Sequence, residues 1–436
     1  MSDLSSGLHA RLARLRRELP PAAPVEKSAL PEWLAARLAA GGVPEECLGA
    51  ARTVELPNAL EEVRGERGTF AVRLQRFAEG HAHGAFALEE ARAGSGAELA
   101  WLARDERLAG LDPATSVYLD IETTGLSGGA GTIPFLVALG RFDGGDFELW
   151  QAFLRGPEEE AAALEAVAER IRAASGVVSF FGKSFDRHRL EDKMRLHRIA
   201  PPFDEKPHLD LYHPLTRLYR GAFADGRLAT FERELCGVER GDDLPGSLAP
   251  AAWLDFLARR AHRLEAVFRH NELDVLSLVV LAAHLVRARP EARVDGGALT
   301  GCGRARARGL AELCAARRDF AGALEWLERA LVRPGSDEGA LWFRHAECLR
   351  RLGERERALA EFLRLARERR DALGATAWGE VLRLARRLKR AEIEQEARAE
   401  GPAAVERTLT GRARARRLAP YQRVARAGRT SGAPSA

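Results

Sequence analysis

The sequence predicts an α/β domain with a mixed five-stranded sheet flanked by helices, followed by an all-α domain of repeated helices. Between residues 116 and 154, apolar and polar side chains alternate with the period of two that β-strands show. After Pro290 the pattern becomes helical and repeats at an offset of 35 residues. The chain of 436 residues is about three times the length of a typical domain of ~150 residues, so we expect two or three folded units.

Three strands open the α/β part. The first follows Ser116, and segments 132–142 and 147–154 form the next two. Residues 143–146 read Asp-Gly-Gly-Asp between the second and the third strand, which indicates a hairpin because glycine adopts the backbone angles of tight turns. We therefore expect an antiparallel sheet at the start of this domain.

Helices and two further strands complete the α/β part. After the third strand we expect a helix from Pro157 to about Ala174, a buried strand at Val177–Phe181, a helix through His197, an extended segment at 208–212, and helices at 228–236, 250–259 and 264–286. Three antiparallel strands followed by helix, strand, helix, strand and helices is the element order of the ribonuclease H-like fold. We assign residues 111–290 to this domain.

A second domain of helical repeats is expected at residues 296–400. Ala323–Leu327 matches Ala358–Phe362, and the offset is close to the tetratricopeptide period of about 34 residues. Helices are expected near 303–317, 320–333, 338–352 and 355–369, with a further helical stretch at 374–399. Arrays of this kind usually present a groove to peptides or proteins, so we expect a protein partner for this domain.

The two ends of the chain carry no recognised chemistry. Residues 1–110 predict a mostly helical extension of unknown role, with a short strand-like segment at 69–75. Residues 401–436 hold eight arginines and one glutamate, a charge of +7 that leaves about −3 for the rest of a chain whose net charge is +4. We expect this basic tail to be disordered, and it either adds salt-sensitive affinity for nucleic acid or is simply solvated.

Cysteine usage and apolar runs limit the class of protein. The five cysteines form no CxxC pair, so neither a disulfide framework nor a zinc knuckle is indicated. The longest apolar run, Val275–Val286, has twelve residues and is interrupted by His284, and the N-terminal residues contain no apolar signal region. The expectation is a cytoplasmic protein without a membrane span.

Candidate chemistry begins with Asp120 and Glu122 on the first strand. Because one residue separates them, both carboxylates lie on the same face, ~7 Å apart along the backbone, which is close enough to hold hard divalent cations. Strands often carry such a pair on a solvated face. Here the opposite face is apolar, and the pair lies at the end of the first strand, before a turn that contains Thr123 and Gly125. The flanking sequence therefore supports a metal site.

Further candidates lie on two helices. Asp186 begins the helix after the second buried strand, where a carboxylate also gains from the helix dipole. His270 and Asp274 are four residues apart on the last long helix and share a face, so they form either a general base beside a metal ligand or a surface ion pair. Lys183 and Arg187 flank Asp186 and either contact a nucleic-acid backbone or belong to a solvated helix face.

Glycines also mark the segment after the first strand. In Gly128–Gly131, backbone amides either approach a phosphate or a terminal nucleotide, or the segment is only a flexible connection between two strands. Thr123 and Gly125, in the preceding turn, are candidate substrate contacts together with Lys183 and Arg187.

Taken together, the acids resemble the DEDD exonuclease superfamily. An Asp-x-Glu pair on a first strand, an aspartate at a later helix start and a histidine and aspartate on a late helix follow in that order. Leu119–Thr132, Gly182–Asp186 and His270–Leu278 further resemble the predicted bacterial YprB-like exonucleases. That family also joins a ribonuclease H-like domain to tetratricopeptide repeats, and the resemblance covers about residues 110–370.

The resemblance implies a two-metal phosphodiesterase that removes nucleotides from the 3′ end of DNA or RNA. It implies that two Mg²⁺ or Mn²⁺ ions are held by four carboxylates, those of Asp120, Glu122, Asp186 and Asp274. It further implies that His270 takes the proton from the attacking water.

Two departures from the family pattern leave alternatives open. In the superfamily the base is a histidine five residues before the last aspartate or a tyrosine four before it, whereas His270 is a histidine four residues before Asp274. Phe181 occupies a position that is commonly asparagine in similar proteins. The alternatives are a catalytically weak or inactive scaffold that binds nucleic acid or protein partners through its repeats, and an endonuclease on the same fold.

Overall fold

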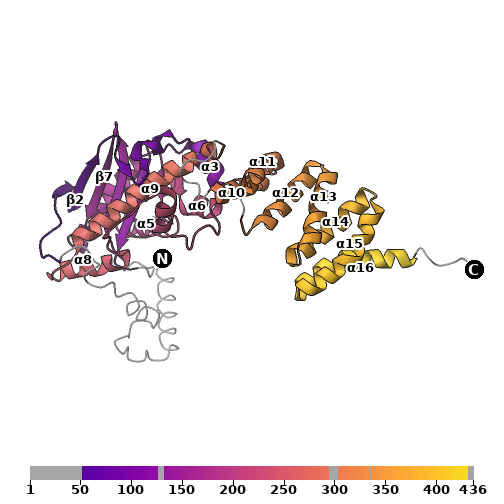
Figure 1. The fold of residues 1–436 in the computed structure, drawn as a ribbon. Helices are drawn as coiled ribbons and strands as arrows, with labels where there is room; N and C mark the ends of the chain where they lie inside the picture. The colour runs from indigo at the N-terminus through magenta and orange to yellow at the C-terminus, as the bar shows by residue number, and fades with distance from the viewer. Residues whose placement is uncertain (1–51, 126–131, 294–302, 333–334, 431–436) are drawn as a thin grey trace, which may run out of the picture. The chain divides into compact units, whose positions relative to one another are not determined.

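The computed structural model describes residues 52–125, 132–293, 303–332 and 335–430 of the chain. Figure 1 shows all the labelled strands in the first part of the described chain and only helices from α10 onward. This order agrees with the predicted succession of an α/β part and an all-α part.

One mixed sheet organises the first part. Its seven strands run in the order β1-β2-β7-β6-β5-β8-β9, and β5, β8 and β9 are parallel while the other neighbours are antiparallel. The strands are β1 Leu60–Gly65, β2 Gly68–Phe77, β5 Val117–Thr123, β6 Pro134–Asp143, β7 Asp146–Phe153, β8 Val177–Ser179 and β9 His208–Asp210, and a separate small ribbon pairs β3 Ala82–His83 with β4 Phe86–Ala87. The predicted mixed sheet is confirmed, but the prediction of five strands is wrong.

β1 and β2 lie outside the predicted five-stranded sheet, although the strand-like segment 69–75 falls within β2. β2 pairs with β7, with Ala71 opposite Phe153, and it buries Phe70. Arg73 is also buried in β2, because its guanidinium pairs with Glu265 at 2.6 Å. The alternating pattern of such a strand is visible locally, but its membership of the sheet depends on a partner far along the chain.

The described part of the N-terminal extension, residues 52–110, is therefore not mostly helical. Its strands β1 and β2 extend the antiparallel side of the main sheet, and its one α-helix is α3, Gly96–Ala103.

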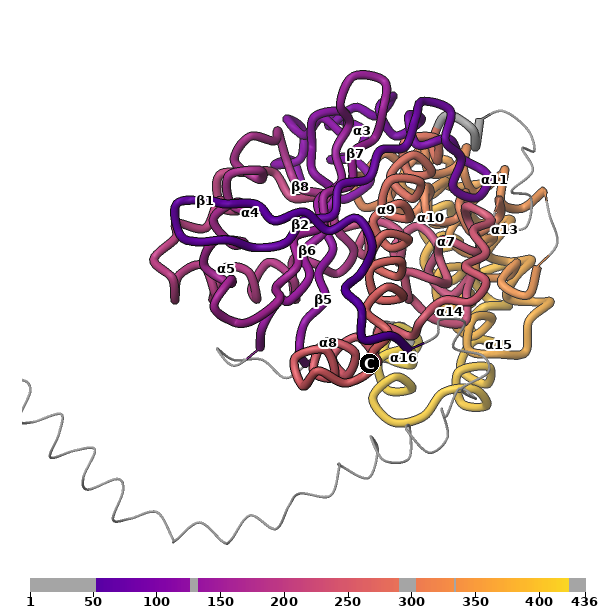
Figure 2. Tube along the Cα trace, turned by 90° about the vertical axis from the view of Figure 1, so that its left-hand side faces the viewer, coloured from indigo at the N-terminus to yellow at the C-terminus, as the bar shows by residue number. Residues whose placement is uncertain are grey.

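Helices cover both faces of the sheet. They are α4 Glu160–Ala173, α5 Asp186–Leu196, α6 Tyr212–Leu218, α7 Leu228–Cys236, α8 Ala249–Leu257 and α9 Leu264–Arg293. α4 packs on β2, β6 and β7, and α9 packs on β5 and β6. Figure 2 shows α4 and α5 on one side of the strands and α9 on the other. Among the described helices, none is both long enough and apolar enough to cross a bilayer.

A glycine on β6 brings α9 close to the sheet. A Cβ atom at Gly140 would lie 2.7 Å from the side chain of Val275 and 2.4 Å from that of Phe147, so no larger residue fits there without a shift. The N-terminal half of α9 is thus held against β5 and β6, where the polar residues of β5 face it.

The all-α part is a succession of helices, each packed on the next. They are α10 Gly303–Ala316, α11 Phe320–Leu331, α12 Glu338–Leu352, α13 Arg355–Glu368, α14 Ala372–Arg387, α15 Ala391–Thr408 and α16 Gly411–Thr430. The predicted helical region is present, and its assignment to tetratricopeptide repeats stays a prediction.

The C-terminal end departs from one expectation. The stretch predicted as helical at 374–399 is helical, and it is divided between α14 and α15, with Lys389 at φ 57° in the break. The tail is expected to be disordered, but residues 401–408 and 411–430 are helical. Tyr421 of α16 is buried in the apolar cluster of the preceding helices, and this packing outweighs the arginine-rich composition that suggested disorder.

Candidate active site

The four predicted carboxylates come from three elements. Asp120 and Glu122 lie on β5, Asp186 is the first residue of α5, and Asp274 lies on α9. Burial raises the pKa of Asp120 well above its usual value, and the charges of Asp274 and Asp186 raise it further. Burial also raises the pKa of Glu122, with the charge of Asp120 as the next cause. The structure therefore places these carboxylates close enough to affect one another's protonation, in a part of the protein that is shielded from solvent.

Asp186 depends on a tight turn between β8 and α5. A Cβ atom at Gly182 would lie 2.4 Å from the hydroxyl of Ser179 and 3.0 Å from the carboxylate of Asp186, so the turn requires glycine. Burial raises the pKa of Asp186 to about 8, and the charges of Asp210 and Asp274 contribute in the same direction.

A buried amide chain orients Asp120. Asn271 of α9 is fully buried and donates from Nδ2 to Oδ2 of Asp120 at 2.6 Å. Gln151 of β7 in turn donates to Oδ1 of Asn271 at 2.8 Å and to the carbonyl of Phe268 at 2.9 Å. The Asp120 carboxylate is thus fixed from the sheet and from α9. Sequence reasoning missed Asn271, although it lies inside the predicted motif.

His270 lies between two carboxylates. Its Nδ1 is 2.7 Å from Oδ2 of Asp243, and its Nε2 is 3.6 Å from Oδ2 of Asp274. Burial opposes protonation of His270, but the hydrogen bond with Asp243 and the charges of both aspartates outweigh it, so the pKa of His270 is raised. The i and i+4 spacing therefore places the imidazole at the carboxylate cluster.

Arg240 is a second residue that sequence reasoning missed. Its guanidinium pairs with Asp274 at 2.5 Å, with Asp243 at 3.0 Å and with the buried Glu232 at 2.8 Å. Arg240 and Asp243 lie in the segment 240–246, which reads RGDDLPG between two helices. The charged residues and glycines of this segment are typical of a polar loop. Nothing in the local pattern indicates that the loop contacts α9.

The donor set fits hard divalent cations. Carboxylate oxygens are the ligands that Mg²⁺ and Mn²⁺ prefer. A cation would offset the burial and the repulsion that together raise the pKa of Asp120, Glu122 and Asp186. Within the described ranges, no group of three or more His, Cys, Asp or Glu side chains is already arranged to hold a metal. Arg240 pairs with Asp274 and Asn271 binds Asp120, so the oxygens of those two acids are partly engaged.

The four predicted substrate contacts have different surroundings. Thr123 donates to the carbonyl of Gly125 at 3.0 Å, so this hydroxyl is engaged within the turn. Lys183 lies 3.5 Å from Asp105 through its Nζ. Arg187 pairs with Glu191 at 2.6 Å and with Asp204. The glycine-rich segment Gly128–Gly131 lies outside the described residues.

Phe181 shows why asparagine suits its position. The residue has a φ of 59°, in the left-handed region where bulky side chains are uncommon and asparagine is enriched. Its side chain is 46% exposed, immediately before the turn that leads to Asp186. The departure from the family pattern therefore places an aromatic ring in solvent beside the carboxylates.

The fold and the site define the class of the first domain. Residues 117–286, from the start of β5 into α9, match the family model described as RNase_H superfamily. This region is therefore similar to the RNase H superfamily.

A curated relative is the uncharacterized protein YprB of Bacillus subtilis (strain 168). The two chains are 35% identical over 170 residues, which is 38% of this chain and 41% of that protein. The chain therefore matches about two fifths of the length of this relative.

Proposed function

We propose that this protein is a metal-dependent 3′–5′ exonuclease that hydrolyses phosphodiester bonds of DNA or RNA. The observation that carries the proposal is the meeting of four carboxylates, from β5, α5 and α9, on an RNase H superfamily domain. Strongly shifted pKa values in such a cluster are typical of functional sites. The polarity is taken from the resemblance to the DEDD exonucleases.

Asp120, Glu122, Asp186 and Asp274 are the residues that would hold two Mg²⁺ or Mn²⁺ ions. When bound, such a pair of ions supplies an activated water and charge stabilisation at the leaving oxygen. The rest of the chemistry rests on side chains of the chain itself.

His270 is the proposed base. The hydrogen bond to Asp243 keeps a proton on Nδ1, so the lone pair of Nε2 is available on the side of the carboxylate cluster. A water molecule held beside Asp274 can then give its proton to Nε2. Asn271 and Gln151 keep Asp120 in one orientation during this proton transfer.

A second candidate function is favoured by Arg240. Because its guanidinium pairs with Asp274, this acid is engaged before any cation arrives. A weak or inactive nuclease-like scaffold that binds nucleic acid would carry the same contact.

End-labelled cleavage separates the two candidates. Single-stranded DNA and RNA labelled at the 5′ end are incubated with the protein and Mg²⁺ or Mn²⁺, beside the Asp120→Asn and Asp274→Asn variants. The control is Asp192→Asn, whose side chain lies on α5 and is 53% exposed. The proposal expects shortening from the 3′ end that only the first two variants abolish. Intact substrate with every metal, together with retained binding, would favour the scaffold.

A further inference from the structure

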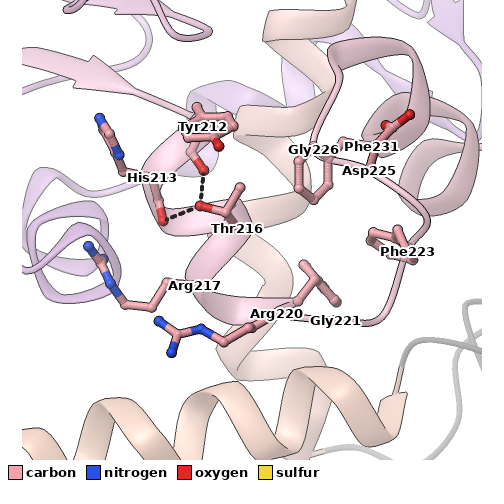
Figure 3. Close-up of a pocket in the computed structure, with 11 residues that line it drawn as sticks. Tyr212, His213, Thr216, Arg217, Arg220, Gly221, Phe223, Asp225, Gly226 and Phe231 are labelled. Carbon is pink, nitrogen blue, oxygen red and sulfur yellow. Dashed lines mark hydrogen bonds between the residues drawn. The ribbon is translucent and has the colours of Figure 1, made fainter.

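A cavity of about 410 Å³ lies along α6 and the loop that follows it (Figure 3). Tyr212, His213, Arg217 and Arg220 contribute to its lining, and Figure 3 shows the imidazole and both guanidinium groups on the same side of α6. Asp225 is also in the lining, and its carboxylate accepts hydrogen bonds from Thr230 at 2.6 Å and from the amide of Arg227 at 3.1 Å. The wall therefore combines an aromatic ring with positive charge.

An aromatic pair links this cavity to the carboxylate cluster. The ring of Phe181 lies edge-on to the ring of Tyr212, with centroids 5.0 Å apart. Asp210 holds both residues, since its carboxylate accepts the amide N–H of Phe181 at 2.8 Å and that of Tyr212 at 3.1 Å. Gly182 follows Phe181, and a Cβ atom at Gly182 would lie 3.0 Å from the carboxylate of Asp186. The turn thus places the aromatic pair beside a proposed metal ligand.

The conformation of Phe181 is costly and exposes the ring. A left-handed backbone disfavours a bulky residue by roughly 1–2 kcal/mol, and exposing the ring forgoes the gain from burying apolar surface. The preceding Phe180, by contrast, packs against the apolar core. An exposed ring held beside a nuclease-like site is suited to stacking on a nucleobase.

The two arginines of the cavity, and Arg104 near them, lack acidic partners. Among the residues that the structure describes, Arg104, Arg217 and Arg220 form no ion pair. Arg217 donates to the carbonyls of Leu102 and Ala103 at 3.1 and 3.0 Å. Burial lowers the pKa of Arg217, and the charges of Arg104 and Arg220 lower it further. A bound anion would offset this crowding of positive charge.

The positive surface continues toward the helical repeats. Arg217 and Arg220 also line a second cavity, of about 750 Å³, to which α10, α11 and α12 contribute. Arg104, Arg308, Arg344 and Arg351 are in the same lining, where Arg308 pairs with Asp337 and Arg344 with Glu347. The two cavities therefore share a wall of arginines.

We infer that Phe181, Tyr212, Arg217, Arg220 and Arg104 form a track for a single strand of nucleic acid that leaves the carboxylate cluster along α6. A base stacks on Phe181, and the phosphates that follow bind the arginines. A single strand fits this surface because a duplex hides the faces of its bases. The role of the track in guiding a substrate rests on the proposed function. Binding of nucleic acid by the track, however, can be measured without cleavage.

The first test is Phe181→Asn in the full-length protein. Asparagine adopts the left-handed backbone readily, so this variant removes the ring without a risk to folding. Fluorescence anisotropy with a labelled single-stranded oligonucleotide in chelator should show Kd about tenfold weaker than wild type, the scale of one lost stacking contact. Phe181→Tyr, which restores a ring, should bind like wild type.

The second test reverses charges on the track. Arg220→Glu and Arg104→Glu should each weaken binding and reduce the slope of log Kd against log salt by about one or more. The matched control is Arg64→Glu on β1, the strand at the opposite edge of the sheet from β9, which should leave both quantities unchanged.

The outcomes separate this inference from the proposed function. Wild-type affinity in Phe181→Asn, Arg220→Glu and Arg104→Glu would overturn the track. The two cavities would then be candidates for binding a protein partner. Asp120→Asn should abolish cleavage but keep binding in chelator. If instead the track variants lose binding while wild-type protein never cleaves, the track stands and the proposed exonuclease fails.

Discussion

The two faces of the central sheet each bury carboxylates, but in opposite electrostatic surroundings. On the α4 face, the buried Glu148 of β7 lies within 3.2 Å of Arg76, 3.1 Å of Arg141 and 3.8 Å of Arg170. On the α9 face, burial raises the pKa of Asp120 and of Glu122, and neighbouring carboxylates raise both further. A buried charge that several arginines of the chain compensate contributes to the fold. Four carboxylates with one arginine, Arg240, beside Asp274 are instead suited to binding cations from outside.

The largest expected effect is on the rate of cleavage, which should depend on the carboxylates of the cluster and not on Glu148. Asp120→Asn and Asp274→Asn should each lower the rate of cleavage by about 10³-fold, because metal ligands contribute several kcal/mol to the transition state. Glu148→Gln should leave that rate unchanged in a gel assay with end-labelled substrate. An equal loss of rate in Glu148→Gln would remove the distinction between the two faces.

Asp243 should act as a positioning residue for His270. Asp243→Asn loses the anion that orients the imidazole, so kcat should fall about 10- to 100-fold with KM unchanged. Asp243→Glu, which keeps the charge, should recover part of kcat. A rise in KM without a change in kcat would show that Asp243 serves only the surrounding structure.

On the α4 face, loss of the Glu148 charge should lower the free energy of unfolding. Glu148→Gln removes the acid from three arginines and should lower the free energy of unfolding by about 1–2 kcal/mol, since the arginines are partly exposed. Urea unfolding measures this loss. Asp120→Asn, which relieves repulsion, should raise the stability of the metal-free protein, and a loss of stability there would contradict the comparison.

The carboxylate cluster should also make the stability of the metal-free protein depend on pH. The pKa of Asp186 is raised from 3.8 to about 8, so the folded state holds a proton that the unfolded state releases between these values. Its contribution to stability is therefore present at low pH and is lost as pH rises toward 8. Thermal unfolding in chelator from pH 5 to 8.5 should show a flatter pH dependence for Asp186→Asn than for wild type or Asp192→Asn. Equal slopes would contradict this assignment.

The smallest expected effect concerns Phe181. Phe181→Asn relieves the left-handed strain and should raise the free energy of unfolding by roughly 1 kcal/mol. Urea unfolding of the metal-free protein checks this gain. A loss of stability would show that the ring has a packing role instead of an exposed one.

Sequence reasoning reached the carboxylates because their spacing is local. Asp120 and Glu122 share a strand face, and His270 and Asp274 share a helix face, so each pair is readable without a partner element. Asp243 was not readable, since its contact with His270 depends on how a loop folds back on α9. The role of Arg240 was hidden for the same reason.

The fold divides in the same way. Strands β5 to β9 follow from alternation and hairpin signals, whereas adding β1 and β2 depends on a pairing with β7 that no local pattern shows. The helicity of α16 was missed because composition outweighed the few apolar residues, such as Tyr421, that pack it on its neighbours.

Binding of Mn²⁺ tests the central claim most directly, because it probes the carboxylate cluster without requiring turnover. Isothermal titration of the metal-free full-length protein should show Mn²⁺ binding that Asp120→Asn and Asp186→Asn remove and that Glu148→Gln retains. Binding of equal strength in all three variants, or none in the wild type, would contradict the claim that the carboxylates of β5, α5 and α9 are held together for divalent cations.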